Sequence, residues 1–285
     1  MTLILAFKLS HGDGEAVLVA SDSKATAAFG IAYEVKKIRP IRFKGSAVGI
    51  VSGAGDSALV KAGFKLADDI LLRYAEKEYP VSHDAFARAA EEVQSGLLTK
   101  FSQLRGLNLD PDFRMILCGL DLSGKASIYS YDGRGLSEPV HENPGYAMIG
   151  SGFVTGGVLL LKLLGYTPDV GLDGLGLMNT FILDNVSEVD TAVGPFVGEC
   201  YLMRIEHDKG ARQIFLGALK DDALVEYKRK ASSRRDLLRM VWKASDRLGE
   251  EKVRELLSPP REHTSGQAAE AHRHMNKRKP KRDVS

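Results

Sequence analysis

Threonine at position 2 is the residue whose chemistry depends most on its place in the chain. A small residue after the initiator permits removal of Met1, which would leave Thr2 with a free α-amino group. Such a residue carries both a hydroxyl nucleophile and a base, because an α-amine with a pKa of about 7.7 to 8.0 can take the hydroxyl proton near neutrality. Many chains begin Met-Thr by chance, so Thr2 alone does not establish this chemistry.

Five short runs further along the chain combine polar residues and glycines at expected strand ends and turns. They are ASDSKAT at 20–26, VKKI at 35–38, SGAGD at 52–56, IGSG at 149–152 and VDTAVG at 189–194. Each run also has a plain structural interpretation. Asp22 and Lys24 fit a solvated turn, Lys37 fits a surface pair with its neighbour, and Gly53 fits a turn into a helix. The IGSG run at a helix start could bind an anion, although it lacks the lysine and spacing of a phosphate loop.

In order and approximate spacing, these runs resemble the proteasome β-subunit family and, equally, its bacterial relative, the peptidase subunit of the HslV type. The resemblance covers roughly residues 1–216 of 285. It implies an α+β fold, the four-layer αββα sandwich of N-terminal nucleophile (Ntn) hydrolases. It also implies a threonine-type peptidase that hydrolyses peptide bonds by acyl transfer.

Three residues form the reacting group that the resemblance implies. Thr2 would be the nucleophile, and Asp22 would be the carboxylate that orients a lysine. That lysine would be Lys37, whose cation near the nucleophile favours the deprotonated hydroxyl and amine.

Five further residues receive supporting roles from the same resemblance. Gly53 would direct its backbone N–H at the oxyanion, where a side chain would block the substrate. Ser151 and Asp190 would hydrogen-bond around the terminal amine. Lys24 and Thr26 would bind substrate, Thr26 along an extended substrate backbone.

The sequence departs from the family pattern at three places near the reacting group. The interval between Thr2 and Asp22 is several residues longer than usual, which a longer first hairpin would absorb. Val193 stands where a serine usually lies near the terminal amine, and Leu3 replaces a second threonine. These departures concern the efficiency of the site more than the fold.

The resemblance extends to partners and leaves alternatives open. It implies a homo-oligomeric ring with an inner chamber, peptide or unfolded-protein substrates, and an ATP-dependent unfoldase as a candidate partner. We expect no cofactor and no metal, because the closest histidine pair, His272 and His274, fits a solvated tail. One alternative is a small-molecule amidase of the same fold, and another is a non-catalytic ring or scaffold subunit.

Hydrophobic periodicity predicts the elements that must position these residues. Alternation predicts strands within 3–9, 15–20, 31–33, 37–42, 46–51, 113–120, 126–131 and 146–149, with a hairpin loop at 10–14 and a closing hairpin over 196–216. Helical spacing predicts helices over 59–74, 82–101, 154–164 and 174–186. This order lacks the strict alternation of a parallel α/β sheet. It favours two antiparallel sheets stacked face to face, with a helix pair outside each.

Composition narrows the setting of the protein. Thirty-nine basic and 37 acidic residues leave a net charge of +2, which argues against nucleic-acid and membrane partners. Cys118 and Cys200 lie in apolar runs and fit buried thiols in a reducing cytoplasm. We predict a domain at 1–220, a helical extension at 221–257 and a disordered basic tail at 258–285, whose run 277–282 could touch nucleic acid or an acidic partner surface.

Overall fold

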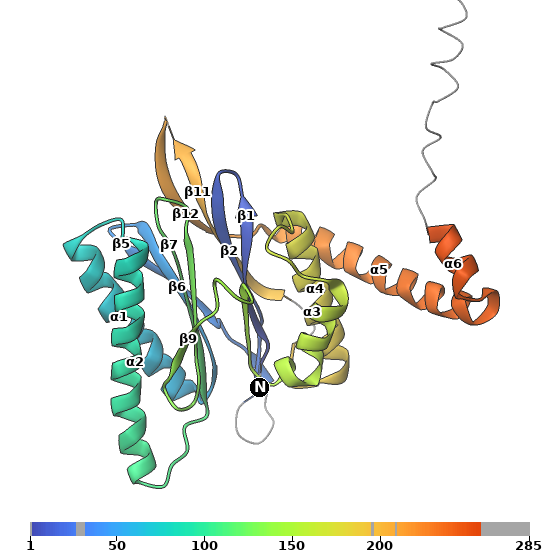
Figure 1. The fold of residues 1–285 in the computed structure, drawn as a ribbon. Helices are drawn as coiled ribbons and strands as arrows, with labels where there is room; N and C mark the ends of the chain where they lie inside the picture. Colours follow the sequence, from blue (N-terminus) through green and yellow to red (C-terminus); the bar gives the residue numbers. More distant parts are fainter. Residues whose placement is uncertain (1, 27–31, 195–196, 209, 258–285) are drawn as a thin grey trace, which may run out of the picture. The chain divides into compact units, whose positions relative to one another are not determined.

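The computed structural model describes residues 2–26, 32–194, 197–208 and 210–257. Two five-stranded antiparallel sheets form the centre (Figure 1). The first has the order β10-β1-β2-β11-β12 and consists of β1 (Ile4–His11), β2 (Gly14–Asp22), β10 (Tyr146–Ile149), β11 (Val197–Asp208) and β12 (Ala211–Ala218). The second has the order β5-β6-β7-β8-β9 and consists of β5 (Ile38–Phe43), β6 (Ser46–Gly55), β7 (Phe113–Leu120), β8 (Ala126–Tyr131) and β9 (Ser137–Pro139).

Helices cover the outer face of each sheet. The helices α1 (Ser57–Lys77) and α2 (His83–Gly106) lie on the second sheet, while α3 (Val158–Leu164) and α4 (Leu172–Val189) lie on the first (Figure 1). The side chains of Asp56 and Ser82 cap α1 and α2 by accepting N–H groups of their first turns. The predicted four-layer αββα sandwich is therefore confirmed.

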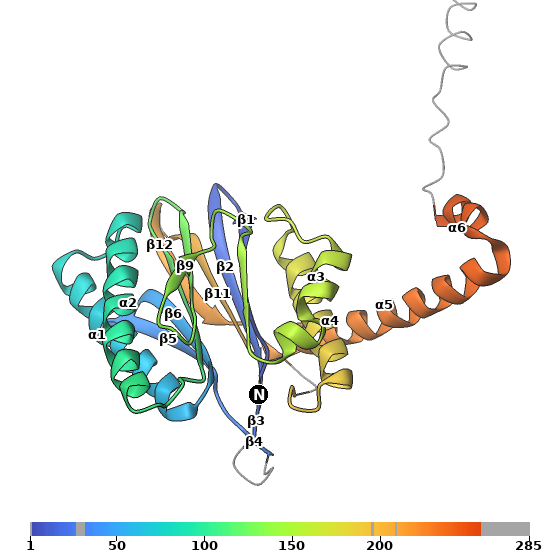
Figure 2. The same cartoon turned by 60° about the horizontal axis from the view of Figure 1, so that its bottom comes forward.

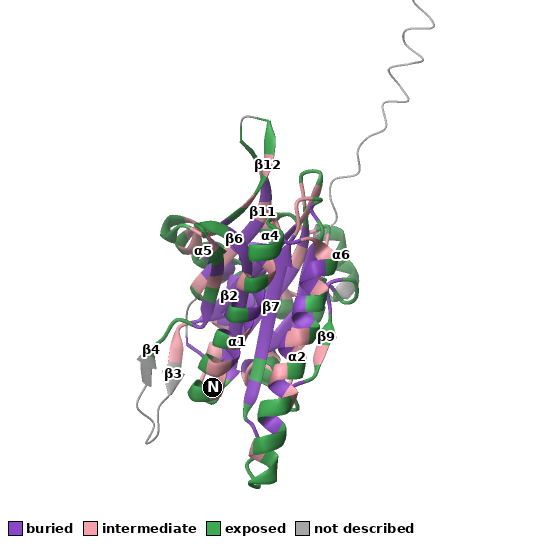
Figure 3. Cartoon of the chain, turned by 90° about the vertical axis from the view of Figure 1, so that its left-hand side faces the viewer, coloured by how far each residue is buried: buried purple, intermediate pink, exposed green. Residues whose placement is uncertain are grey.

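The central strands of the two sheets, such as β2, β6 and β7, are buried on both faces, as the purple in Figure 3 makes visible. Along β1, Ile4 packs between the two sheets, whereas Leu5 and Phe7 pack toward α3 and α4. A separate apolar layer, which includes Phe86 and Phe101, lies between the second sheet and its helices. Strands that are buried on both faces hold their ends rigidly, and the ends of β1, β2 and β5 carry the candidate site.

Glycines account for two differences from the predicted strand boundaries. β6 continues to Gly55, so Gly53 lies inside a strand and not in a turn. A Cβ at Gly53 would lie 2.7 Å from the Val60 side chain, which explains the glycine as a packing requirement under α1. The predicted loop at 10–14 is too long, because His11 pairs with Gly14 and only two residues form the turn.

Two short elements were not evident from the sequence pattern. The strands β3 (Lys24–Thr26) and β4 (Ala32–Glu34) form a hairpin at the same end of the sandwich as the start of β1 (Figure 2). The strand β4 corresponds to the one predicted at 31–33, whereas β3 was not predicted, because its three residues carry little periodicity. A π-helical turn, η2 (Phe153–Gly157), precedes α3 where one continuous helix was predicted.

The C-terminal extension is helical, as predicted, with α5 (Asp221–Leu248) and α6 (Glu250–Leu257). The chain divides into two compact units, Met1–Arg235 and Asp236–Ser285. Within the first unit, Tyr227 and Ala231 of α5 pack against α4. The boundary after residue 220 stays a prediction, and the predicted disorder of 258–285 lies outside the described residues.

Candidate active site

Two glycines hold the backbone of residue 2. Thr2 lies directly before β1 with only 4% of its surface exposed, and its carbonyl accepts the Gly152 N–H at 3.2 Å. Gly150 has a φ of 97°, and a Cβ there would lie 2.0 Å from the Thr2 carbonyl oxygen. Only glycine permits this approach. The IGSG run therefore cradles residue 2, and the Gly152 N–H is not free for an anion.

Thr2, Asp22 and Lys37 come together through their side chains. The Thr2 hydroxyl donates to Asp22 Oδ1 at 2.6 Å, and the Lys37 ammonium lies 2.7 Å from the same oxygen. The ammonium also donates to Thr2 Oγ1 and to the Lys24 carbonyl oxygen. An ammonium has three hydrogens, so Lys37 has one acceptor for each of them.

Backbone N–H groups complete the environment of the Asp22 carboxylate. Its Oδ1 accepts the Leu3 N–H at 2.8 Å, and its Oδ2 accepts the N–H groups of Lys24 at 3.1 Å and Gly194 at 2.9 Å. Asp22 is fully buried. A buried ion pair needs such additional hydrogen bonds, because the desolvation of two charges otherwise exceeds their attraction.

The charge of Lys37 is set by opposing influences. Burial lowers the pKa of the Lys37 ammonium below its usual value, while the charges of Asp22 and Glu199 oppose that shift. The protonated ammonium stabilises negative charge on the Thr2 oxygen. The arrangement can therefore lower the cost of removing the Thr2 hydroxyl proton.

Ser151 and Asp190 meet beside this trio. The Ser151 hydroxyl donates to Asp190 Oδ2 at 3.0 Å, and Thr155 donates to the same oxygen at 3.1 Å. Asp190 Oδ1 accepts the Ala192 N–H at 3.0 Å and so shapes the loop after α4. These side chains bond to one another, and Val193, three residues after Asp190, is buried in the core. Their predicted contact with a terminal amine remains a prediction.

The remaining three predicted residues, Gly53, Lys24 and Thr26, lie in different relations to the site. The Gly53 N–H donates to the Lys37 carbonyl at 3.3 Å. It could therefore donate to an oxyanion only after this bond to the Lys37 carbonyl is broken. Lys24 reaches the site through its backbone, while its ammonium donates to the Thr191 carbonyl. Thr26 lies opposite Ala32 in the hairpin of β3 and β4. Substrate binding by Lys24 and Thr26 stays a prediction.

Comparison with known proteins gives a fold and no more. No protein-family pattern and no curated protein matches the sequence. Anbu proteins are among the solved structures that resemble it. An Anbu (Gly-1) mutant from Hyphomicrobium sp. strain MC1 shares 18% identity with a TM-score of 0.64, covering 85% of this chain and 97% of its own. Anbu (ancestral β-subunit) from Yersinia bercovieri shares 16% identity with a TM-score of 0.64 and the same coverage.

A third match is described as a helical assembly of the Anbu complex from Pseudomonas aeruginosa. It shares 18% identity with a TM-score of 0.59 and covers 92% of this chain and all of its own. The fold is that of the Anbu proteins. Assignment to the proteasome β-subunit and HslV-type family is therefore wrong, because the neighbours are a distinct though related proteasome-like branch. The short motifs belong to the part of the fold that holds residue 2. They therefore did not distinguish between related branches of this fold.

Three contributors to the candidate site were missed by sequence reasoning. Gly194 donates its N–H to Asp22, Thr155 bonds to Asp190, and Glu199 accepts the N–H groups of Lys37 and Ile38. A signal existed for Thr155, which lies four residues after Ser151 at a helix start. Glu199 lies in a predicted strand, where an acidic residue fits a solvent-facing position equally well.

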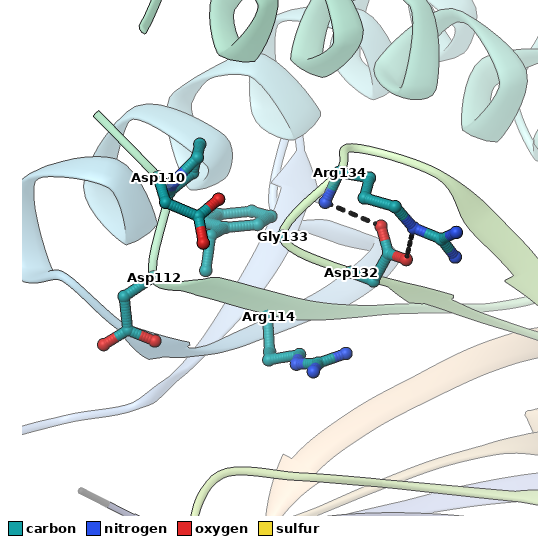
Figure 4. A pocket seen from close by; sticks show the side chains of 8 residues that line it. Asp110, Asp112, Arg114, Asp132, Gly133 and Arg134 are labelled. Carbon is teal, nitrogen blue, oxygen red and sulfur yellow. Dashed lines mark hydrogen bonds and ion pairs between the residues drawn. The ribbon is translucent and has the colours of Figure 1, made fainter. Parts of the chain in front are cut away.

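A polar pocket of about 270 Å³ lies apart from all predicted site residues (Figure 4). Its lining comprises Asp110, Pro111, Asp112, Phe113, Arg114, Asp132, Gly133 and Arg134. Asp132 is paired with Arg134 at 2.6 Å. Arg114 pairs with Ala54 in the sheet, next to Gly53, so the pocket lies at the same end of the second sheet as the candidate site.

In the part of the chain that the structure describes, no group of three or more His, Cys, Asp or Glu side chains could hold a metal ion. No helix among those residues has the length and apolarity to cross a membrane. Cys118 and Cys200 are buried free thiols, as predicted.

Proposed function

We propose that this chain is a threonine peptidase that hydrolyses peptide bonds by acyl transfer through Thr2 after removal of Met1. The observation that carries the proposal is the Thr2 hydroxyl, held between the Asp22 carboxylate and the Lys37 ammonium. A solvated turn would not bury three such groups in mutual hydrogen bonds. A nucleophile, a cation and an orienting carboxylate within hydrogen-bond reach are the components of an activated hydroxyl.

The reaction proceeds in two stages. Thr2 Oγ attacks the amide carbonyl carbon while the α-amine of Thr2 takes the hydroxyl proton, and Lys37 stabilises the developing charge. The C–N bond then breaks, and the proton leaves with the amine product. Water attacks the resulting ester, which releases the acid and restores the hydroxyl. The Gly53 N–H serves the oxyanion once substrate displaces it from the Lys37 carbonyl.

The proposed substrates are peptides or unfolded proteins, and the proposed working form is a homo-oligomer. The Pseudomonas aeruginosa relative is described as a helical assembly, which supports self-association of this fold. An ATP-dependent unfoldase would supply unfolded chains to an enclosed site. We place the protein in the cytoplasm, and the two buried free thiols support that location.

The test combines mass spectrometry with covalent labelling. The intact mass of the natively produced protein should lack Met1. A β-lactone probe should then add its full mass to Thr2, because opening the lactone ring by the hydroxyl loses no atom. A Thr2→Ala variant, which retains the fold but lacks the hydroxyl, should remain unlabelled. Retention of Met1 in the assembled native protein would defeat the proposed mechanism.

The two alternatives correspond to other outcomes of the same experiment. A correctly processed protein that forms no Thr2 adduct would be a non-catalytic scaffold subunit. A labelled protein that stays monomeric and cleaves only small amides would be an amidase of the same fold. Size-exclusion chromatography and a fluorogenic peptide assay on the labelled and unlabelled protein distinguish these cases.

A further inference from the structure

Glu199 joins the two sheets at the residue that carries the cation. It lies on β11 of the first sheet, and its Oε2 accepts the Lys37 N–H at 2.8 Å and the Ile38 N–H at 3.1 Å. Lys37 and Ile38 mark the beginning of β5, the edge strand of the second sheet. One carboxylate oxygen from one sheet therefore binds the first two N–H groups of a strand in the other.

This contact replaces part of the normal strand ladder. Lys37 lies opposite Gly53, and in an antiparallel hydrogen-bonded pair each residue donates to the other. Only the Gly53 N–H follows that pattern, at 3.3 Å, whereas the Lys37 N–H turns to Glu199. The start of β5 is thus held by a carboxylate and one long backbone bond. A charge-assisted bond to N–H is roughly twice as strong as a neutral one.

The position of this backbone determines where the ammonium lies. The Lys37 side chain is buried and uses its three hydrogens on Thr2, Asp22 and Lys24, so a shift of the strand start breaks several bonds together. Displacements of about 1 Å in a reacting group can cost about a hundredfold in rate. The charge of Glu199 also favours the protonated ammonium, in the same direction as Asp22.

We propose that Glu199 is a positioning residue that holds Lys37 at Thr2 by binding the start of β5 to β11. The inference rests on the proposed function for its catalytic consequence, although the positioning itself does not. Glu199 touches no reacting atom and acts through Lys37. The site is then built from residues of both sheets.

The experiment compares Glu199→Ala and Glu199→Gln with Glu206→Gln, a control on the same strand whose partner is Arg204. Two readouts are measured: the rate of Thr2 acylation by a β-lactone across pH, and amide hydrogen exchange at Lys37 and Ile38. Thermal unfolding checks that each variant is folded.

Glu199→Ala should lower the acylation rate about tenfold or more, and exchange at Lys37 and Ile38 should become faster. Glu199→Gln retains an acceptor oxygen, so exchange should stay close to that of the unaltered protein. Its acylation should decline at a lower pH, because one charge that favours the Lys37 cation is lost. The Glu206→Gln control should change neither readout.

Unaltered exchange and acylation in folded Glu199→Ala would overturn the proposal. If the unaltered protein is not acylated at all, the proposed function fails, and the exchange measurement alone still decides whether Glu199 positions Lys37. Faster exchange confined to residues other than Lys37 and Ile38 would also overturn it, because a general loosening of the fold is not positioning.

Discussion

Two groups of polar residues flank the nucleophile, and they are built differently. Lys37 and Asp22 bond directly to the Thr2 hydroxyl and are buried with every hydrogen of the ammonium satisfied. Ser151 and Asp190 bond to each other and to the loop after α4. The first group belongs to the sheets, whereas the second belongs to the helix layer outside them.

The difference corresponds to the two tasks of Thr2 in the proposed mechanism, which are attack by its hydroxyl and proton transfer by its α-amine. In that mechanism, Lys37 and Asp22 activate the hydroxyl, and their side chains already contact it in this structure. The predicted binding of the amine would depend on Ser151 and Asp190, and the neighbouring Gly150 and Gly152 lie against the backbone of residue 2. Loss of a charge in the first group should therefore remove most of the activity, while substitutions in the second should weaken it.

The largest effect is expected at the nucleophile. Thr2→Ala should reduce hydrolysis of a fluorogenic peptide by about 10³-fold or more, because the attacking oxygen is gone. Thr2→Ser keeps a hydroxyl between Asp22 and Lys37 and should retain part of the activity. Equal rates for the unaltered protein and Thr2→Ala would show that another group performs the reaction.

The next largest effect concerns the backbone that the two groups share. Gly150→Ala places a Cβ where the Thr2 carbonyl lies, at a φ of 97°, and should destabilise the fold by about 3 kcal/mol or more. The matched control is Gly12→Ala, at a φ of 60° with nothing within 4 Å, which should cost about 1 kcal/mol. Urea unfolding measures both. Similar losses in the free energy of unfolding for the two variants would mean that the backbone at Thr2 moves to make room for the added Cβ.

A smaller effect is expected in the second group. Ser151→Ala removes one hydrogen bond to Asp190 and should lower the acylation rate about tenfold, as expected for one lost hydrogen bond. Ser102→Ala, which removes a side-chain bond to the Leu98 carbonyl on exposed α2, should leave the rate unchanged. A loss as large as that of Thr2→Ala would place Ser151 with the first group.

The smallest effect is a shift of a pH profile. Because burial lowers the pKa of Lys37 below 10.5, the cation should be lost as pH rises through that lowered value. Acylation of Thr2 should then decline on the alkaline side below the usual lysine range. In Lys37→Arg the charge persists to higher pH, so the remaining activity should lack this decline. A profile unchanged by Lys37→Arg would assign the decline to another group.

The strands and helices follow from the sequence because their periodicity is local, and their order favoured the sandwich. The trio of Thr2, Asp22 and Lys37 was predicted only through the resemblance of the ordered motifs to a proteasome-like family. Gly53 illustrates the limit of such reasoning. A glycine next to a helix start looks like a turn, but here it sits inside β6 because α1 packs directly over it.

The sequence by itself determined the layers, since periodicity expresses burial directly, and it predicted a chemistry for residue 2 that stays a proposal. Only the tertiary structure decided which groups complete the site. Gly194 lies 172 positions from Asp22, and Glu199 lies 162 positions from Lys37. Such contacts depend on how two sheets stack and where their strands end, and no pattern along one strand encodes the position of another.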